Sequence, residues 1–134
     1  MSPTQIKNKY RRRIMAILER IANVLREAGF EVEGPWDLSS DDYCWSLLAD
    51  VNGMKVDVSF KICESEQYDG EKGGVNFALD IVEEGGRIIG GLTPFNYSEQ
   101  CWVSRKDKQA VEERFRILEQ ADEEEIPQLL KEAV

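Results

Sequence analysis

The chain has 134 residues and a net charge of −9, and it contains no histidine. This length suits one α+β domain, residues 1–134, with a core of its own. The missing histidine excludes Ser-His-Asp and Cys-His nucleophile pairs, histidine acid-base chemistry near neutral pH and most zinc sites.

The first predicted element is a long amphipathic helix at about residues 4–28. Apolar residues recur there at helical spacing, and Gly29 stands where a left-handed residue often ends a helix. Residues 1–26 carry a net charge of +6, whereas residues 27–103 carry −12. Five basic side chains cluster near the start of the helix: Lys7, Lys9, Arg11, Arg12 and Arg13. They either bind a polyanion or lie against the protein's own acidic sheet, and the overall acidity favours the second because it repels a phosphate backbone.

A short edge strand is predicted in FEVEGPW, residues 30–36, where apolar and polar residues alternate briefly. Proline has no N–H to donate to a neighbouring strand, so Pro35 is expected to end this strand. The polar stretch DLSSDD then leads into the next element.

The stretch ADVNGMKVDVSFKI, residues 49–62, predicts a hairpin with Asn52-Gly53 as its type I′ turn. This turn sets Val51 opposite Met54, and the pairing runs back to Tyr43 opposite Ile62. One face is then entirely apolar and forms a wall of the core, which includes Trp45, Leu47, Val58 and Phe60. The other face is mainly polar and carries Cys44, Ser46, Leu48, Asp50, Lys55, Asp57, Ser59 and Lys61. A slip of one residue would bury these polar groups, so the register is strongly specified.

Residues 64–74 are polar, contain several glycines and lack periodicity, which predicts a mobile connection. Alternation then resumes, and EEGG supplies the turn of a second hairpin. Its return strand is expected to bring three residues to the face of Ile81: Ile88, Gly90 and Leu92. The opposite face is expected to carry Asn76, Ala78, Asp80, Val82 and Ile89.

The C-terminal part predicts a short strand near Val103 and then a helix that begins at Ser104, with Asp107 as the acidic partner of this N-cap. The apolar face of this helix consists of Ala110, Val111, Phe115, Leu118 and Ala121. Pro127 suits the first turn of a short terminal helix.

The order of elements therefore predicts an α+β fold. Two hairpins and a short edge strand form an antiparallel β-meander of four to five strands. An antiparallel sheet of this kind has one face to cover, and the N-terminal and C-terminal amphipathic helices are available to cover it.

The sequence predicts a cytoplasmic protein without a membrane span. No apolar run approaches the roughly 18–20 residues that a spanning helix needs, and MSPTQIKNKYRRR lacks the apolar block of a secretory signal. The cysteines, Cys44, Cys63 and Cys101, are odd in number and show no CxxC spacing, so we expect reduced thiols rather than disulfides or a thiolate metal site.

One group of residues bears on catalysis. Asp50, Asp57 and Lys61 project from the polar face of the first hairpin, and this resembles the arrangement in metal-dependent nucleases of the PD-(D/E)xK kind. The sequence departs from that pattern, because Ser59 stands where a carboxylate is needed two residues before the lysine. Metal-dependent phosphodiester hydrolysis is therefore a second hypothesis, and nucleic-acid binding through the basic helix is a third.

The first hypothesis is a non-catalytic module that binds another protein, as an adaptor, escort or inhibitor of the immunity-protein type. It rests on the missing catalytic groups, the acidity and the apolar residues on the polar sheet face. The predicted partner is another protein or a second copy of the chain, without a cofactor, metal, nucleic acid or membrane. The candidate binding residues are Leu48, Asp57, Ser59, Lys61, Asp80, Val82 and Ile89.

Overall fold

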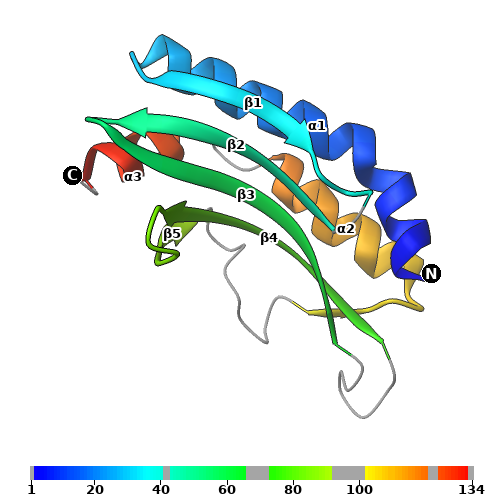
Figure 1. Ribbon diagram of the computed structural model, residues 1–134. Coiled ribbons are helices and arrows are strands. Elements are labelled where there is room, and N and C mark those ends of the chain that lie inside the picture. Colours follow the sequence, from blue (N-terminus) through cyan, green and yellow to red (C-terminus); the bar gives the residue numbers. More distant parts are fainter. Residues whose placement is uncertain (1, 41–42, 66–72, 92–101, 121–123, 133–134) are drawn as a thin grey trace.

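The computed structural model of the chain describes residues 2–40, 43–65, 73–91, 102–120 and 124–132. Its elements in chain order are α1 (Pro3–Glu27), β1 (Glu31–Asp37), β2 (Cys44–Val51), β3 (Met54–Ser65), β4 (Gly74–Glu83), β5 (Ile88–Gly91), β6 (Val103–Ser104), α2 (Lys108–Glu119) and α3 (Glu125–Glu132) (Figure 1). The fold is α+β, as predicted.

The sheet is an antiparallel meander in the order β1-β2-β3-β4-β5, with the short strand β6 beside β4. β5 and β6 pair with different parts of β4, because Gly91 lies opposite Asp80 whereas Ser104 lies opposite Gly74. The connection predicted at residues 64–74 is shorter than expected, because β3 continues to Ser65 and β4 begins at Gly74. Residues 66–72 lie outside the described residues.

The first hairpin has the predicted register. Val51 pairs with Met54, Cys44 pairs with Lys61, and the N–H of Ile62 donates to the carbonyl of Tyr43. Asn52 has a φ of 54° and Gly53 a φ of 88°, as a type I′ turn requires. The predicted core residues of this hairpin, Trp45, Leu47, Val58 and Phe60, are buried.

The edge strand β1 continues beyond the residue that was expected to end it. Its pairing with β2 shifts between Glu33 and Trp36, so Gly34 and Pro35 form a bulge and the strand resumes as far as Asp37. Gly34 adopts a φ of 92°, which suits a bulge, and a proline on an edge strand removes no hydrogen bond from the sheet.

A second irregularity corrects the predicted faces of β5. The pairing of β4 with β5 shifts between Ile81 and Val82, so Gly90 lies opposite Ile81 as expected but Ile88 lies opposite Val82. Ile88 therefore shares the face of Val82 and is 58% exposed. Leu92 lies outside the described residues.

Helix α1 begins at a capping box formed by Ser2 and Gln5, and Gly29 follows its end with a φ of 95°. The N-cap of α2 is Asp107, whose carboxylate accepts a hydrogen bond from the N–H of Ala110. The prediction of Ser104 was wrong because this residue belongs to β6 and its carbonyl accepts from the N–H of Asp107 in a turn before the helix. Pro127 lies in the first turn of α3, as predicted.

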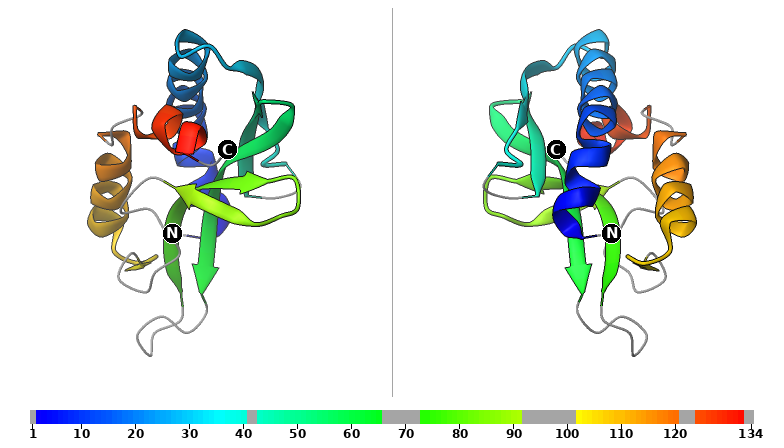
Figure 2. Two further views of the ribbon diagram at one scale, coloured as in Figure 1. Left: turned by 90° about the vertical axis from the view of Figure 1, so that its left-hand side faces the viewer. Right: turned by 90° about the vertical axis from the view of Figure 1, so that its right-hand side faces the viewer.

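The helices cover one face of the sheet, and the side views place them together on that side (Figure 2). Apolar residues from α1, the sheet, α2 and α3 form one continuous core. The ring centroid of Phe60 lies 6.0 Å from that of Trp45, 6.2 Å from that of Phe77 and 6.3 Å from that of Phe115. No helix in the described part of the chain is long and apolar enough to cross a membrane.

Candidate functional site

The basic residues near the start of α1 mostly contact the protein itself. Lys7 donates to the carbonyl of Ser39 at 2.9 Å, and Arg11 lies 2.5 Å from a carboxylate oxygen of Asp37. Lys9 lies 3.8 Å from Glu112, on α2. Of the five predicted nucleic-acid contacts, Lys9, Arg11 and Arg12 are exposed on α1, and the first two of these pair with carboxylates of the chain.

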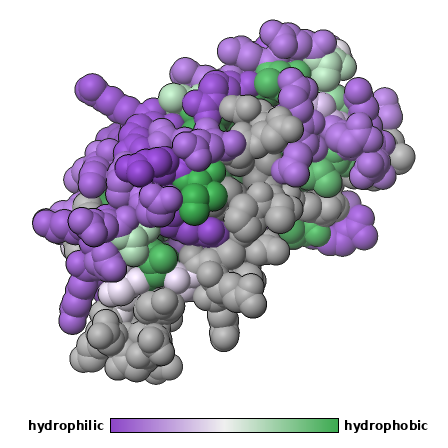
Figure 3. All heavy atoms as spheres, turned by 180° about the vertical axis from the view of Figure 1, so that it is seen from behind, coloured by the Kyte–Doolittle hydropathy of each residue, from purple (hydrophilic) through white to green (hydrophobic). Residues whose placement is uncertain are grey.

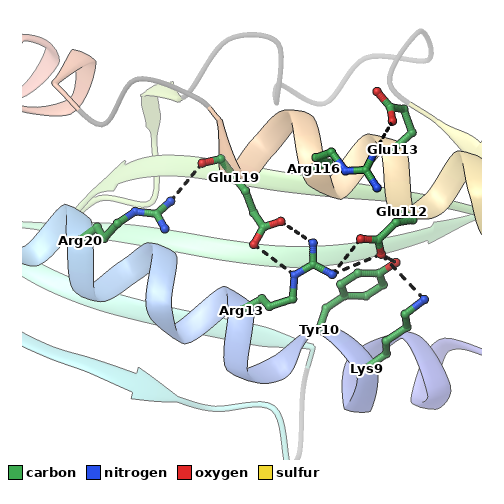
Figure 4. Close-up of polar contacts among 8 residues, drawn as sticks. All are labelled: Lys9, Tyr10, Arg13, Arg20, Glu112, Glu113, Arg116 and Glu119. Atoms are coloured by element: carbon green, nitrogen blue, oxygen red, sulfur yellow. Dashed lines mark hydrogen bonds and ion pairs between the residues drawn. The ribbon is translucent and has the colours of Figure 1, made fainter.

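Arg13 has the most contacts of this group. Its guanidinium lies between Glu112 and Glu119 of α2, with a distance of 3.0 Å from Nη1 to Glu112 Oε1 and 3.1 Å from Nε to Glu119 Oε2 (Figure 4). It also lies 4.7 Å from the ring centroid of Phe115 and 5.3 Å from that of Tyr10. The two helices are therefore joined by an ion cluster placed over aromatic rings.

Tyr10 and Glu112 complete the contact between the two helices. The Tyr10 hydroxyl donates to Glu112 Oε2 at 2.7 Å, and the Tyr10 ring stacks on Phe115. Burial and the bond to Glu112 raise the pKa of Tyr10. Partial burial would raise the pKa of Glu112, but the hydrogen bonds from Tyr10 and Arg13 lower it. Much of the positive charge of α1 is thus neutralised within the chain, by acidic residues of α2 and by Asp37.

Asp37 anchors the end of β1 to α1. Partial burial would raise the pKa of its carboxyl, but hydrogen bonds from Ser39 and Arg11 lower the pKa to about 2. Because the folded pKa lies below the unfolded value of about 3.9, the charged carboxylate stabilises the fold above about pH 4. This contribution is lost as the pH falls from about 4 towards 2.

We expect Asp37→Asn to lower the free energy of unfolding by about 1 kcal/mol at pH 7, a figure that allows for the half-exposed Arg11 partner. The difference between the variant and the wild type should shrink below pH 4. Urea denaturation at pH 7, 5, 4 and 3 measures it, with Glu27→Gln as an exposed control on α1. A difference that stays constant down to pH 3 would contradict this assignment.

The second face of the sheet, opposite the helices, carries most of the predicted binding residues. Residues in register lie side by side across strands and share a face. One row across this polar face consists of Trp36, Ser46, Ser59, Asp80 and Gly91. A neighbouring row consists of Glu33, Leu48, Asp57, Val82 and Ile88. On the other side of the first row, Cys44 lies beside Lys61 and Lys61 beside Ala78.

This polar face is less open than the sequence suggested. Ser46 and Ser59 are each 5% exposed, and Ala78 is 1% exposed. Leu48 and Val82 are half-buried, whereas Lys61 is exposed. These three small buried residues, Ser46, Ser59 and Ala78, form what we call the floor of the polar face, and larger side chains surround them. Ile89 belongs to β5, and its side chain lies outside the described part of the structure.

Two half-buried carboxylates stand on this floor. Asp57 and Asp80 lie diagonally across β3 and β4, because Asp80 pairs with Ser59, two residues from Asp57. Burial raises the pKa of both carboxyls, and the positive charge of Lys61 acts in the opposite direction on each. Ser59 also donates to Asp57 at 3.1 Å, which favours the charged form.

Asn76 lies farther along β4 on the same face, opposite Cys63. It is fully buried, and within the described part of the chain neither its Nδ2 nor its Oδ1 has a hydrogen-bond partner. A buried amide without partners costs about 1–3 kcal/mol per unsatisfied group. Burial, and next the charge of Asp80, raise the pKa of the Cys63 thiol.

Sequence reasoning missed two large apolar residues at opposite edges of this face. Trp36 of β1 is 40% exposed and lies beside Ser46. Ile88 of β5 lies beside Val82. Both depend on a bulge, which shifts the alternation on which the sequence interpretation relied. A tryptophan directly after Gly-Pro is the only sequence signal that pointed to the first.

The residues of the nuclease hypothesis have other contacts. Asp50 lies 3.6 Å from Lys55 and also accepts a hydrogen bond from the N–H of Gly53 in the turn. Asp57 lies diagonally from Asp50, and Lys61 lies a further four residues along β3. Within the described residues, no group of three or more cysteine or carboxylate side chains is placed to hold a metal ion.

The helix-bearing side offers a different surface. Seen from behind, its coloured part is mainly hydrophilic, and hydrophobic side chains appear in separate small groups (Figure 3). Of the exposed large apolar residues, Ile117 lies on α2 and Leu38 directly after β1, whereas Trp36 and Ile88 lie on the polar face of the sheet. The polar face therefore combines apolar edges with charged groups, as protein-binding surfaces do.

Comparisons with protein-family models, with curated proteins and with solved structures gave no match. The arrangement of side chains on the sheet is therefore the basis for a functional assignment.

Proposed function

We propose that this chain is a non-catalytic module that binds another protein through the polar face of its sheet. The observation that carries the proposal is the combination of a floor of small buried residues with exposed Trp36 and Ile88 at its edges and half-buried Asp57 and Asp80 upon it. Because Ser46, Ser59 and Ala78 are almost fully covered, a bound chain would contact the larger side chains around them. Aromatic side chains and a polar rim are typical of binding surfaces.

The alternatives have weaker support. Nucleic-acid binding needs free cations on α1, but Lys9, Arg11 and Arg13 are engaged with carboxylates of the chain. Phosphodiester hydrolysis needs Asp50 beside Asp57 around a metal ion, and Asp50 is instead tied to Lys55 and its own turn. The thiol of Cys63 forms no disulfide, which accords with work in the cytoplasm, where thiols stay reduced.

The test is site-specific photo-crosslinking in the native cells. A photoreactive amino acid replaces Lys61, an exposed residue of the polar face, and in a matched variant it replaces Lys131, an exposed residue of α3. We expect irradiation to join position 61 to one or a few discrete proteins, because only that position faces the bound partner. Products that are absent at position 61, or equal at both positions, would contradict the proposal.

A further inference from the structure

We infer that the partner presents a basic side chain, arginine or lysine, to Asp57 and Asp80, with a neighbouring apolar side chain against Trp36. This inference rests on the proposed function and specifies the chemistry of the partner. The occupant is an extended segment of a basic protein that crosses the strands above the buried Ser46 and Ser59 and contacts the larger side chains around them.

The first argument is the position of the two carboxylates. Asp57 and Asp80 are diagonal neighbours on one face, at a spacing of about 7–8 Å between Cα atoms for such pairs. A guanidinium has five N–H donors in a planar fork, so it reaches two carboxylates at once. Lys61, opposite Ala78, approaches the pair from one side and is exposed.

The second argument is charge. The acidic residues of the polar face are Glu31, Glu33, Asp50, Asp57 and Asp80, and its basic residues are Lys55 and Lys61. Lys55 is already held by Glu33 at 3.5 Å and by Asp50 at 3.6 Å. The face lies within a region, residues 27–103, that carries −12. Such a field attracts a basic partner and repels an acidic one.

The third argument is Trp36, which is 40% exposed and lies in the same row as Asp80, with Ser46 and Ser59 between them. Three strand spacings of about 4.8 Å separate the two positions by about 14 Å, and residues i and i+4 of an extended chain lie on one side at about 13 Å from each other. A segment that runs across the strands therefore sets its basic side chain at Asp80 and, four residues away, an apolar one towards Trp36.

The test is an NMR titration of the full chain with the peptide acetyl-Ser-Arg-Ser-Ser-Ser-Leu-Ser-amide. The control peptide carries citrulline, which has a similar shape without the charge, in place of arginine. We expect saturable shifts centred on the amides of Ser59 and Asp80 and on the Trp36 indole. The citrulline peptide should bind at least tenfold more weakly.

Two charge-matched variants locate the site. Asp57→Asn with Asp80→Asn should weaken arginine-peptide binding at least tenfold, whereas Glu113→Gln with Glu132→Gln, on the exposed sides of α2 and α3, should change it less than twofold. If the first double variant loses its dispersed spectrum, Asp80→Asn alone replaces it. Equal weakening by both double variants, equal binding of both peptides, or shifts spread over the whole acidic surface would overturn the inference.

The outcomes separate this inference from the proposed function. Crosslinks at position 61 without arginine-dependent peptide binding would retain the protein-binding function and reject the basic occupant. Peptide binding that depends on Asp57 and Asp80 supports the inference even before a natural partner is known.

Discussion

Replacing Phe60 by alanine should lower the free energy of unfolding by about 3–5 kcal/mol, because it removes buried apolar area and leaves a cavity. Phe60 is fully buried at the centre of the sheet. The rings of Trp45, Phe77 and Phe115 surround it, so β2, β4 and α2 each lose contacts. Urea denaturation of the wild type and the variant, followed by circular dichroism, measures the difference.

The control for this substitution is Ile88→Ala, which also shortens a large apolar residue of the sheet. Ile88 is 58% exposed, so the change should stay within about 0.5 kcal/mol. A loss below about 1 kcal/mol for Phe60→Ala, or equal losses for both variants, would contradict the position of the core.

The best predicted part of the fold was the β2–β3 hairpin. Asn52-Gly53 selects one turn type, and strict alternation then leaves a single register that buries the apolar set, as the pairing of Val51 with Met54 confirms. The helices followed in the same way from their apolar periodicity. These features are local, and each has a sequence signal that agrees with the tertiary structure.

The bulges were not predictable from alternation, because a bulge adds a residue and reverses the faces beyond it. Pro35 predicts the end of β1, yet the strand resumes and places Trp36 on the polar face. The shift in pairing between β4 and β5 similarly places Ile88 on the face of Val82. Trp36 and Ile88, which alternation alone did not assign to the polar face, therefore both lie next to a bulge.

The sequence also could not predict how deeply the residues of the polar face are buried. Alternation assigned Ser59, Ala78 and Asp80 to that face correctly, but it does not show how far their neighbours cover them. The structure shows that small residues there are buried and that Asp57 and Asp80 are half-buried. This difference turns a solvated surface into a candidate site.

The charge asymmetry of the sequence posed a question that only the structure answers. The partners of Arg13 are Glu112 and Glu119, seven residues apart on α2, with Phe115 between them. This spacing places all three on one helix face. The spacing of Glu112, Phe115 and Glu119 could therefore have predicted an acidic stripe next to an aromatic residue. The sequence does not show, however, that the fold places this stripe against α1.

Replacing Arg13 by methionine should lower the free energy of unfolding by about 2 kcal/mol. Methionine keeps most of the apolar packing on Tyr10 and Phe115, so the loss reports mainly the charged hydrogen bonds, each of which contributes about 1.5–3 kcal/mol before screening by solvent. Glu112 and Glu119 then remain close together without the cation between them. A double-mutant cycle with Glu119→Gln should give a coupling energy of about 1 kcal/mol.

The matched control is Arg116→Met on α2. Arg116 pairs with Glu113 at 3.2 Å, but their side chains are 54% and 62% exposed, so its loss should be about 0.3–0.5 kcal/mol. The same ordering should hold at 0.5 M salt, because partly buried pairs are screened less than exposed ones. Equal losses for the two arginine variants would mean that aromatic packing alone holds α1 against α2. In that case the cations of α1 contribute little to the fold, and binding of a polyanion by this helix would again have to be measured directly.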